Sequence, residues 1–103
     1  MLALTALADP TRRQIVEMLA RGERTAGDIA QQFEVSAPAI SQHLKVLRQA
    51  KLVSVRADAQ RRIYALDAAG IGEIDAWLSD IRRFWAGRLD ALEQALREEG
   101  DTP

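Results

Sequence analysis

The sequence has no cysteine and a single histidine among its 103 residues. Without thiols the chain can form no disulfide, no thiolate metal site and no thiol redox switch. Its uninterrupted apolar runs are only a few residues long, far below the roughly 20 residues that span a bilayer. The first residues, MLALTALADPTRR, place no basic region before the apolar ones, unlike a secretory signal. We therefore expect a cytoplasmic protein with no membrane partner.

The length predicts one domain over residues 1–103, and the charge within it is unevenly distributed. The net charge is −1, but residues 1–66 hold ten Lys and Arg against six Asp and Glu, and residues 67–103 hold four against nine. Residues 36–62 hold six cations and one acid, Asp58. Because phosphate binding depends on local cation density, this segment is a candidate for binding nucleic acid.

Residues 25–48, TAGDIAQQFEVSAPAISQHLKVLR, predict two short helices joined by a three-residue turn. Ala30 is small where two helices must cross closely, and Ser36 can cap the second helix through its hydroxyl. On a helical wheel Ile40, Leu44 and Leu47 fall within about 60° of one another. Apolar residues at Phe33 and Val35 complete the core that such a pair buries.

The opposite face of the second helix, at residues 37–50, is polar, cationic and free of carboxylates. Any helical hairpin can show the apolar pattern alone. The small Ala30, the Ser36 cap and the acid-free outer face together favour a helix that lies in a DNA major groove. The predicted DNA-binding residues here are Ser36, Ala37, Pro38, Ser41, Gln42 and Lys45.

Two helices are predicted before this pair. Residues 1–7 form a short apolar one, and Asp9 caps the next, with Pro10 at its first position and Gly22 at its end. Its buried stripe is Ile15, Val16, Met18 and Leu19. Thr25 and Asp28 have capping-box spacing for the third helix.

Residues 52–56 and 62–66 are rich in β-prone residues and predict a hairpin. A hairpin directly after a recognition helix is a wing, and Arg61 and Arg62 at its flank would reach DNA phosphates or the adjoining minor groove. The connection contains no Gly and no Asn, so we expect a longer, mobile loop and not a tight two-residue turn.

The chain from residue 68 to residue 98 predicts one long helix with apolar residues at intervals of seven. This apolar surface is too wide to be covered by the preceding 66 residues, although its first two turns can pack on them. We expect the remainder to meet a second copy, with the first helix as a further apolar element. The predicted dimer interface is Leu2, Leu4, Ile74, Leu78, Ile81, Trp85, Leu89 and Leu92.

The sequence resembles the ArsR/SmtB-type winged-helix transcriptional regulators. The matching stretches are LADPTRRQIVEML, VSAPAISQHLKVLRQAKLV and RRIYALD, and IRRFWAGRLDALEQAL further resembles the SdpR-like autorepressor branch. The resemblance implies a mainly α winged helix-turn-helix with a small β-hairpin, in the order α-α-α-α-β-β-α. It also implies a homodimer that binds double-stranded DNA at an inverted-repeat operator as a repressor or autorepressor.

The sequence departs from the metal-sensing members of that family. Their two cysteines in the third helix align with Thr25 and Gly27 here, and the last helix contains no histidine for their second site. Zinc, nickel and arsenic(III) sites need imidazole or thiolate donors, and carboxylates alone hold hard cations weakly. We therefore expect no metal and no cofactor.

No catalytic arrangement is apparent in the sequence. His43 flanks the buried side of its helix, where a packing role is expected, and no nucleophile or oxyanion site accompanies it. We therefore do not expect this protein to be an enzyme. Two other functions stay open, a winged-helix protein-interaction module and a regulator with a small organic ligand at its dimer interface, lined by Trp77, Phe84 and Trp85. The sequence identifies no effector.

Overall fold

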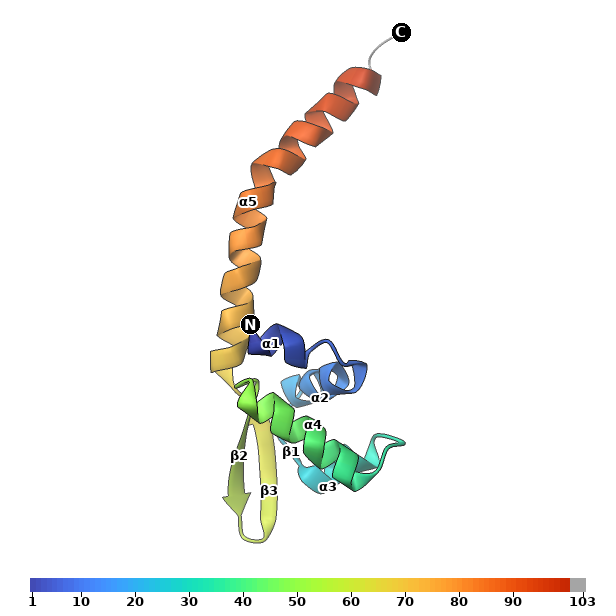
Figure 1. Ribbon diagram of the computed structural model, residues 1–103, viewed down its shortest axis with the longest axis vertical. Coiled ribbons are helices and arrows are strands. Elements are labelled where there is room, and N and C mark those ends of the chain that lie inside the picture. The colour runs from blue at the N-terminus through green and yellow to red at the C-terminus, as the bar shows by residue number, and fades with distance from the viewer. Residues whose placement is uncertain (101–103) are drawn as a thin grey trace.

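The computed structural model describes residues 1–100, which form a small helical body, a β-hairpin and one long helix (Figure 1). The molecule measures 71 × 27 × 21 Å, because the last helix projects from the body as a rod. This is the predicted mainly α class with a winged helix-turn-helix. The elements are α1 (Leu2–Ala6), α2 (Pro10–Ala20), β1 (Arg24–Thr25), α3 (Ala26–Gln31), α4 (Ala37–Gln49), β2 (Val53–Asp58), β3 (Arg61–Leu66) and α5 (Ala68–Gly100).

Three helices begin at the residues that the sequence predicts as caps. The Asp9 carboxylate accepts from the backbone N–H of Arg12 at 3.0 Å, and the Thr25 hydroxyl accepts from Asp28 at 3.1 Å. The Ser36 hydroxyl accepts from the backbone N–H of Ala39 at 3.2 Å. Each bond satisfies one of the amide groups that a helix start leaves without a partner. The predicted caps are confirmed, and α4 stops one residue short of the predicted end.

The strands form an antiparallel sheet in the order β1-β3-β2. The hairpin of β2 and β3 was predicted, but β1 was not. β1 has two residues, Arg24 and Thr25, which pair with Tyr64 and Ile63. A strand of that length leaves no alternating pattern in a sequence, so only the fold reveals it.

The hairpin turn corrects one prediction. Asp58 pairs directly with Arg61, so Ala59 and Gln60 alone make the turn, and the predicted longer loop is wrong. Ala59 adopts a left-handed φ of 58°, which costs roughly 1–2 kcal/mol in a residue with a Cβ. The Arg61 guanidinium donates to the Asp58 carboxylate at 2.8 Å across the turn. Pairing that continues to the turn, together with this ion pair, offsets the strain.

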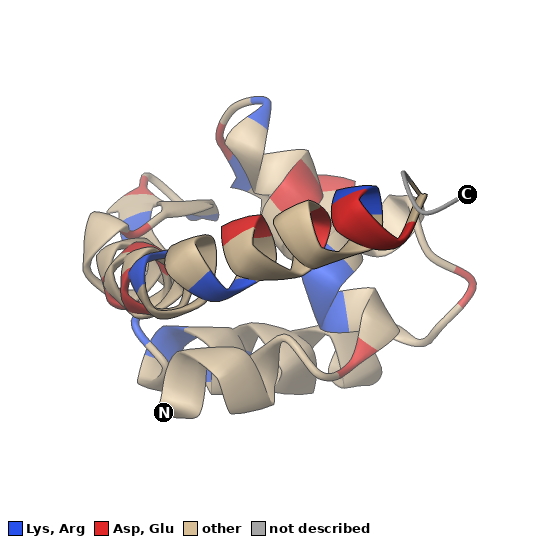
Figure 2. Ribbon diagram, turned by 90° about the horizontal axis from the view of Figure 1, so that it is seen from above, with Lys and Arg blue, Asp and Glu red and all other residues tan. Residues whose placement is uncertain are grey.

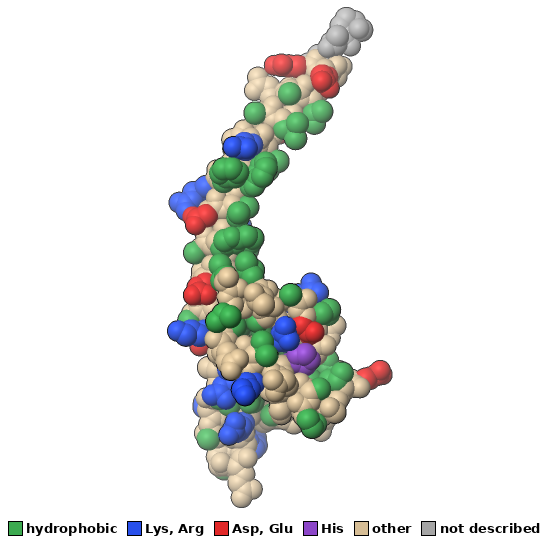
Figure 3. Space-filling view, viewed as in Figure 1, with side chains coloured by type: hydrophobic (Ala, Val, Ile, Leu, Met, Phe, Trp, Pro, Cys, Tyr) green, Lys and Arg blue, Asp and Glu red, His purple; other side chains and the backbone are tan. Residues whose placement is uncertain are grey.

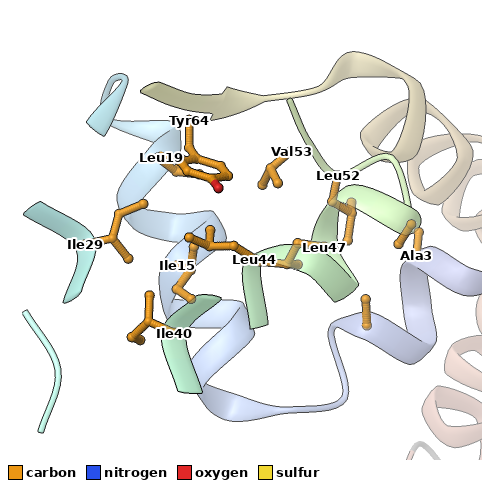
Figure 4. Close-up of a cluster of buried hydrophobic side chains, with 12 residues drawn as sticks. Ala3, Ile15, Leu19, Ile29, Ile40, Leu44, Leu47, Leu52, Val53 and Tyr64 are labelled. Carbon is orange, nitrogen blue, oxygen red and sulfur yellow. The ribbon is translucent and has the colours of Figure 1, made fainter. Parts of the chain in front are cut away.

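The core lies between α1, α2, α3, α4 and the inner face of the wing (Figure 4). Leu44 and Leu47 of α4 lie near Ile15 of α2, near Val53 of β2 and near Leu52, which precedes β2, in that close-up. Within residues 1–100 no buried side-chain polar atom lacks a hydrogen-bond partner. The predicted stripe of α2 is confirmed at Ile15 and Leu19, whereas Val16 and Met18 are half-buried at the edge of the core.

The start of α5 is fixed to the end of α4 through the backbone. The N–H of Asp67 donates to Leu52 O at 2.9 Å, and the N–H of Gly70 donates to Lys51 O at 2.8 Å. A Cβ at position 70 would lie 2.5 Å from that same Lys51 oxygen, so only glycine fits. The base of α5 is thereby attached rigidly to the body.

Beyond Ile74, which packs against the core, α5 leaves the body. Its large apolar side chains are between 36% and 59% exposed, and Figure 3 shows them along one side of the rod. The helix ends at Gly100, two residues beyond its predicted end. None of the described helices combines the length and the apolar character needed to cross a membrane.

Candidate nucleic-acid interface

The two faces of α4 differ as the sequence predicts. Ile40, Leu44 and Leu47 are at most 2% exposed and form the centre of the core. The first turn and the outer face lie in solvent at Ser36, Ala37, Pro38, Ser41, Gln42 and Lys45. Burial of the apolar side fixes the rotation of the helix about its axis. The six residues predicted to contact DNA are therefore brought together on one exposed surface.

The cations of this surface extend beyond the predicted set. Lys45 and Arg48 line a shallow hollow of about 310 Å³ together with Gln49. Arg48 was counted in the basic segment but was not predicted as a site residue. Its position three residues after Lys45 was the available signal, because residues at that spacing are neighbours on a helix. Within residues 1–100 neither cation forms an ion pair with a carboxylate.

The three arginines of the wing differ in their ion-pair partners. Arg61 forms the ion pair with Asp58 described above, whereas Arg62 is exposed opposite Ala57 on the strand ladder. Arg56 of β2 pairs with Glu23 at 2.6 Å, which joins the wing to the segment before β1. Of the two predicted wing residues, Arg62 is the one whose charge is available to a phosphate.

α4 and the hairpin lie at the end of the molecule from which α5 points away (Figure 1). Lys and Arg side chains gather near the hairpin in Figure 3, and apolar side chains follow α5. Figure 2 shows α1 without charged residues and both acidic and basic residues along α5, where seven Asp and Glu outnumber four Arg. The charge asymmetry of the sequence thus becomes a spatial separation between a cationic end and an apolar, acidic rod.

His43 lies on the inner flank of α4, where the sequence placed it. Its Nδ1 is 4.0 Å from the Asp9 carboxylate and 3.4 Å from Nη1 of Arg12. The backbone N–H of Arg12 is the main reason that the pKa of Asp9 is lowered from its ordinary value, and the charge of the Arg12 guanidinium acts in the same direction. The single histidine is therefore part of a contact between helices.

The residues predicted for the dimer interface lie on α1 and along α5. Leu2 is 68% exposed, and Leu4 and Ile74 are half-buried. The remaining ones, all exposed, are Leu78, Ile81, Trp85, Leu89 and Leu92. The rings of Phe84 and Trp85 make an edge contact with centroids 5.5 Å apart, and the Arg88 guanidinium lies 4.4 Å over Phe84.

A second hollow lies on the body, away from α4. An open groove of about 530 Å³ between α2, β1 and α3 has cations at Arg21 and Arg24 and acids at Glu17 and Asp28, so its charges balance. Within residues 1–100 no three His, Cys, Asp or Glu side chains are grouped so that they could hold a metal ion.

Comparison with known proteins assigns the family. Residues 9–55, from the cap of α2 into β2, match the family model described as bacterial regulatory protein, arsR family. The HTH-type transcriptional regulator Rv2034 of Mycobacterium tuberculosis is 48% identical over 99 residues, which cover 96% of this chain and 90% of that protein. The transcriptional repressor SdpR of Bacillus subtilis is 41% identical over 73 residues, 71% of this chain and 81% of that protein.

A solved structure agrees with these relatives. The crystal structure of a possible transcriptional regulator for arsenical resistance is similar to this chain, with a TM-score of 0.74 and 40% sequence identity. The match covers 92% of this chain and 96% of that one. The prediction of a DNA-binding regulator and not an enzyme is confirmed by these relatives. The chain belongs to the ArsR family of bacterial transcriptional regulators.

Proposed function

We propose that this regulator is a homodimeric repressor that binds an inverted-repeat operator through α4 and needs no metal. The observation that carries the proposal is the division of α4 into a buried apolar face and an exposed, carboxylate-free face beside a cationic wing. The relative SdpR is a transcriptional repressor, and we extend that activity to this chain.

The first turns of α4 are suited to reading bases. Gln42 can pair bidentately with an adenine edge in the major groove, and Ser41 can donate or accept there. Ala37 and Pro38 are small or compact, so the start of the helix can approach the groove floor closely. A surface built to bind a protein would normally present aromatic or large apolar anchors, which this face of α4 lacks.

The cations around α4 are suited to phosphates. Lys45 and Arg48 on α4 and Arg62 on the wing lie outside the base-reading residues and are exposed. Contacts of this kind supply affinity without sequence preference and release counterions from the DNA. Arg61 contributes less, because Asp58 already lies 2.8 Å from its guanidinium.

Dimer formation follows from the size of the reading surface and from the exposed rod. One recognition helix reads only a few base pairs, and two copies docked about one helical turn apart, roughly 34–36 Å, read a palindrome. The apolar rows of α5 and the exposed Leu2 of α1 supply a surface through which two copies can pair isologously. Covering this surface would remove it from water.

The absence of a metal requirement rests on donor chemistry. Thr25 and Gly27 occupy the positions of the cysteine ligands, and α5 offers carboxylates without a histidine. Transition-metal sites need softer donors than these. The joint between two α5 helices is therefore proposed to be governed by packing alone.

A footprint on the DNA upstream of the gene that encodes the chain tests the proposal. We expect protection of two half-sites with centres about one helical turn apart. Chelator and added zinc should both leave the protection unchanged. Protection of a single half-site would contradict the dimer, and protection that zinc abolishes or that chelator abolishes would contradict the metal-free mechanism.

A further inference from the structure

The side chain of Arg12, in the first turn of α2, connects two other helices. Its Nε donates to the carbonyl oxygen of Ala6, the last residue of α1, at 2.6 Å. Its Nη1 lies 3.4 Å from Nδ1 of His43 in α4. Because a guanidinium only donates, Nδ1 of His43 is the acceptor in this contact. α1, α2 and α4 therefore meet at one planar group.

The two acceptors belong to helices with different proposed tasks. Ala6 is 2% exposed and ends α1, whose Leu2 is part of the proposed dimer surface. His43 directly follows Gln42, the proposed base reader, on α4. A shift of α1 against α4 would change the distance and angle between the two recognition helices of a dimer. The contact thus lies between the part that sets the dimer and the part that reads DNA.

The guanidinium is suited to fix this relation. Its donors form a rigid planar fork, so a bond from Nε and a contact from Nη1 hold two acceptors in one mutual orientation. The carbonyl of Ala6 is among those at a helix end that have no donor within the helix. The Asp9 carboxylate accepts from the backbone N–H of Arg12 and so holds the same turn in place.

We propose that Arg12 is a positioning residue that sets the spacing at which the dimer reads its two half-sites. It acts through Ala6 on α1 and through His43 on α4, and it touches no base itself. The proposal rests on the proposed function, since it presupposes a dimer that binds two half-sites. It adds the residue that determines which half-site spacing is accepted.

The test measures binding to a set of operators whose spacer is the natural length or is changed by about one or two base pairs, each of which rotates one half-site against the other. The first variant, Arg12→Met, removes both the guanidinium and its positive charge. The second, Arg12→Lys, removes the guanidinium but keeps a positive charge. The matched control is Arg13→Met, which removes an exposed cation one residue along the same helix. Thermal unfolding and light scattering verify that each variant is folded and dimeric under the assay conditions.

We expect wild type and Arg13→Met to prefer the natural spacer strongly. Arg12→Met should lose about tenfold in affinity on the natural spacer, the size of effect of one charged hydrogen bond. On the altered spacers it should lose much less, so its preference flattens. Arg12→Lys should flatten the preference too, since one ammonium cannot reproduce the fork. A folded, dimeric Arg12→Met with the wild-type spacer preference would overturn the proposal.

A second pair of variants tests the other end of the contact and does not touch Arg12. His43→Asn keeps an acceptor for the guanidinium and should retain most of the spacer preference. His43→Leu removes the acceptor and should flatten the preference as Arg12→Met does. Equal behaviour of the two variants would contradict the role of this contact. Failure of the wild type to bind any two-half-site operator is a different result, because it contradicts the proposed function itself.

Discussion

The winged-helix body buries its apolar side chains, whereas α5 leaves most of its apolar side chains exposed. In the body twelve apolar residues are at most 6% exposed, and they come from α1, α2, α3, α4, the wing and the connection between α4 and β2. In α5 the only buried residue is Gly70, and Ile74 is the last residue that packs against the core. The body therefore has the contacts that stabilise its fold, whereas the apolar rows of α5 beyond Ile74 stay exposed within the described residues.

The difference in burial affects how stable each region is by itself. Helices in proteins owe little of their stability to intrinsic propensity and most of it to the packing of an apolar face. Nine large apolar residues of α5, from Ile71 to Leu96, are each at least 36% exposed. Contiguous exposed apolar surface of this kind marks an interaction site. The difference between the two regions is the reason to expect that a partner copy completes α5 but not the body.

The strongest way to break the comparison is to make the exposed face of α5 polar. The double variant Leu78→Glu and Trp85→Glu should be monomeric, because charges replace the centre of the proposed interface. Its operator affinity should fall towards the non-specific level, about 10³-fold or more below that of wild type. Sedimentation and fluorescence anisotropy measure the two effects.

Asp90→Asn serves as the control, since it changes an exposed polar site on the same helix. Because the body has its own core, the double variant should keep a helical circular-dichroism spectrum and a cooperative thermal unfolding transition. A double variant that stays dimeric would contradict the assignment of the interface.

The next largest effect is expected at Gly70, where α5 meets the body. Gly70→Ala places a Cβ 2.5 Å from Lys51 O, which is backbone and cannot move freely, so unfolding should become easier by about 1–3 kcal/mol. Gly72→Ala is the matched control, because nothing lies within 4 Å of its added Cβ. It should stabilise α5 by up to about 1 kcal/mol through helix propensity. Denaturant titration measures both variants, and equal values would contradict the close approach at Gly70.

Base reading by the body is tested at Gln42. Gln42→Ala should cost about 1–3 kcal/mol at one base position in each half-site and little at the others. Gln49→Ala, at the far end of the same helix, should show no such position. Competition against operators with single base changes gives the comparison. A uniform loss of affinity for all sequences would mean that Gln42 is not a reader.

The wing contributes a smaller, sequence-independent effect. Arg62→Ala should reduce the slope of log affinity against log salt by roughly one unit. Arg61→Ala should reduce it less, because Asp58 is already paired with Arg61. Slopes that stay unchanged in both variants would place the wing away from the DNA.

The smallest effect is the pH dependence that Asp9 gives the body. Its pKa is lowered in the folded chain, chiefly by the backbone N–H of Arg12, so its contribution to stability is present above its ordinary pKa of 3.8. That contribution is lost as the pH falls through the lower, folded value. Asp9→Asn keeps a cap but does not titrate, so wild type should lose more stability than the variant as the pH falls below 3.8. Parallel pH profiles would contradict this.

The parts of the fold that the sequence predicts are those set by local rules. The caps at Asp9, Thr25 and Ser36 and the inner and outer faces of α4 follow from side chains within one helical turn of each other. β1 could not be predicted, because its two residues become a strand only when β3 lies beside them. The turn at Ala59 was missed because local propensity disfavours it, and the ladder that enforces it forms between distant residues.

The candidate site shows the same division between local and distant contacts. The exposed residues of α4 were predicted from the helical wheel, which also contained the signal for Arg48. The contact of Arg12 with Ala6 and His43 joins residues up to 31 positions apart, and no spacing rule reports it. The pair of Arg56 with Glu23 was unpredictable for the same reason.

The central claim is that two copies, joined through α5, read one operator. Light scattering on the chain alone and on its complex with a two-half-site operator tests it most directly. We expect the mass of two 11.4 kDa chains for the free protein, and that mass plus the mass of the DNA for the complex, with or without chelator. One chain in free solution and one chain on a DNA whose two half-sites are both protected would contradict it.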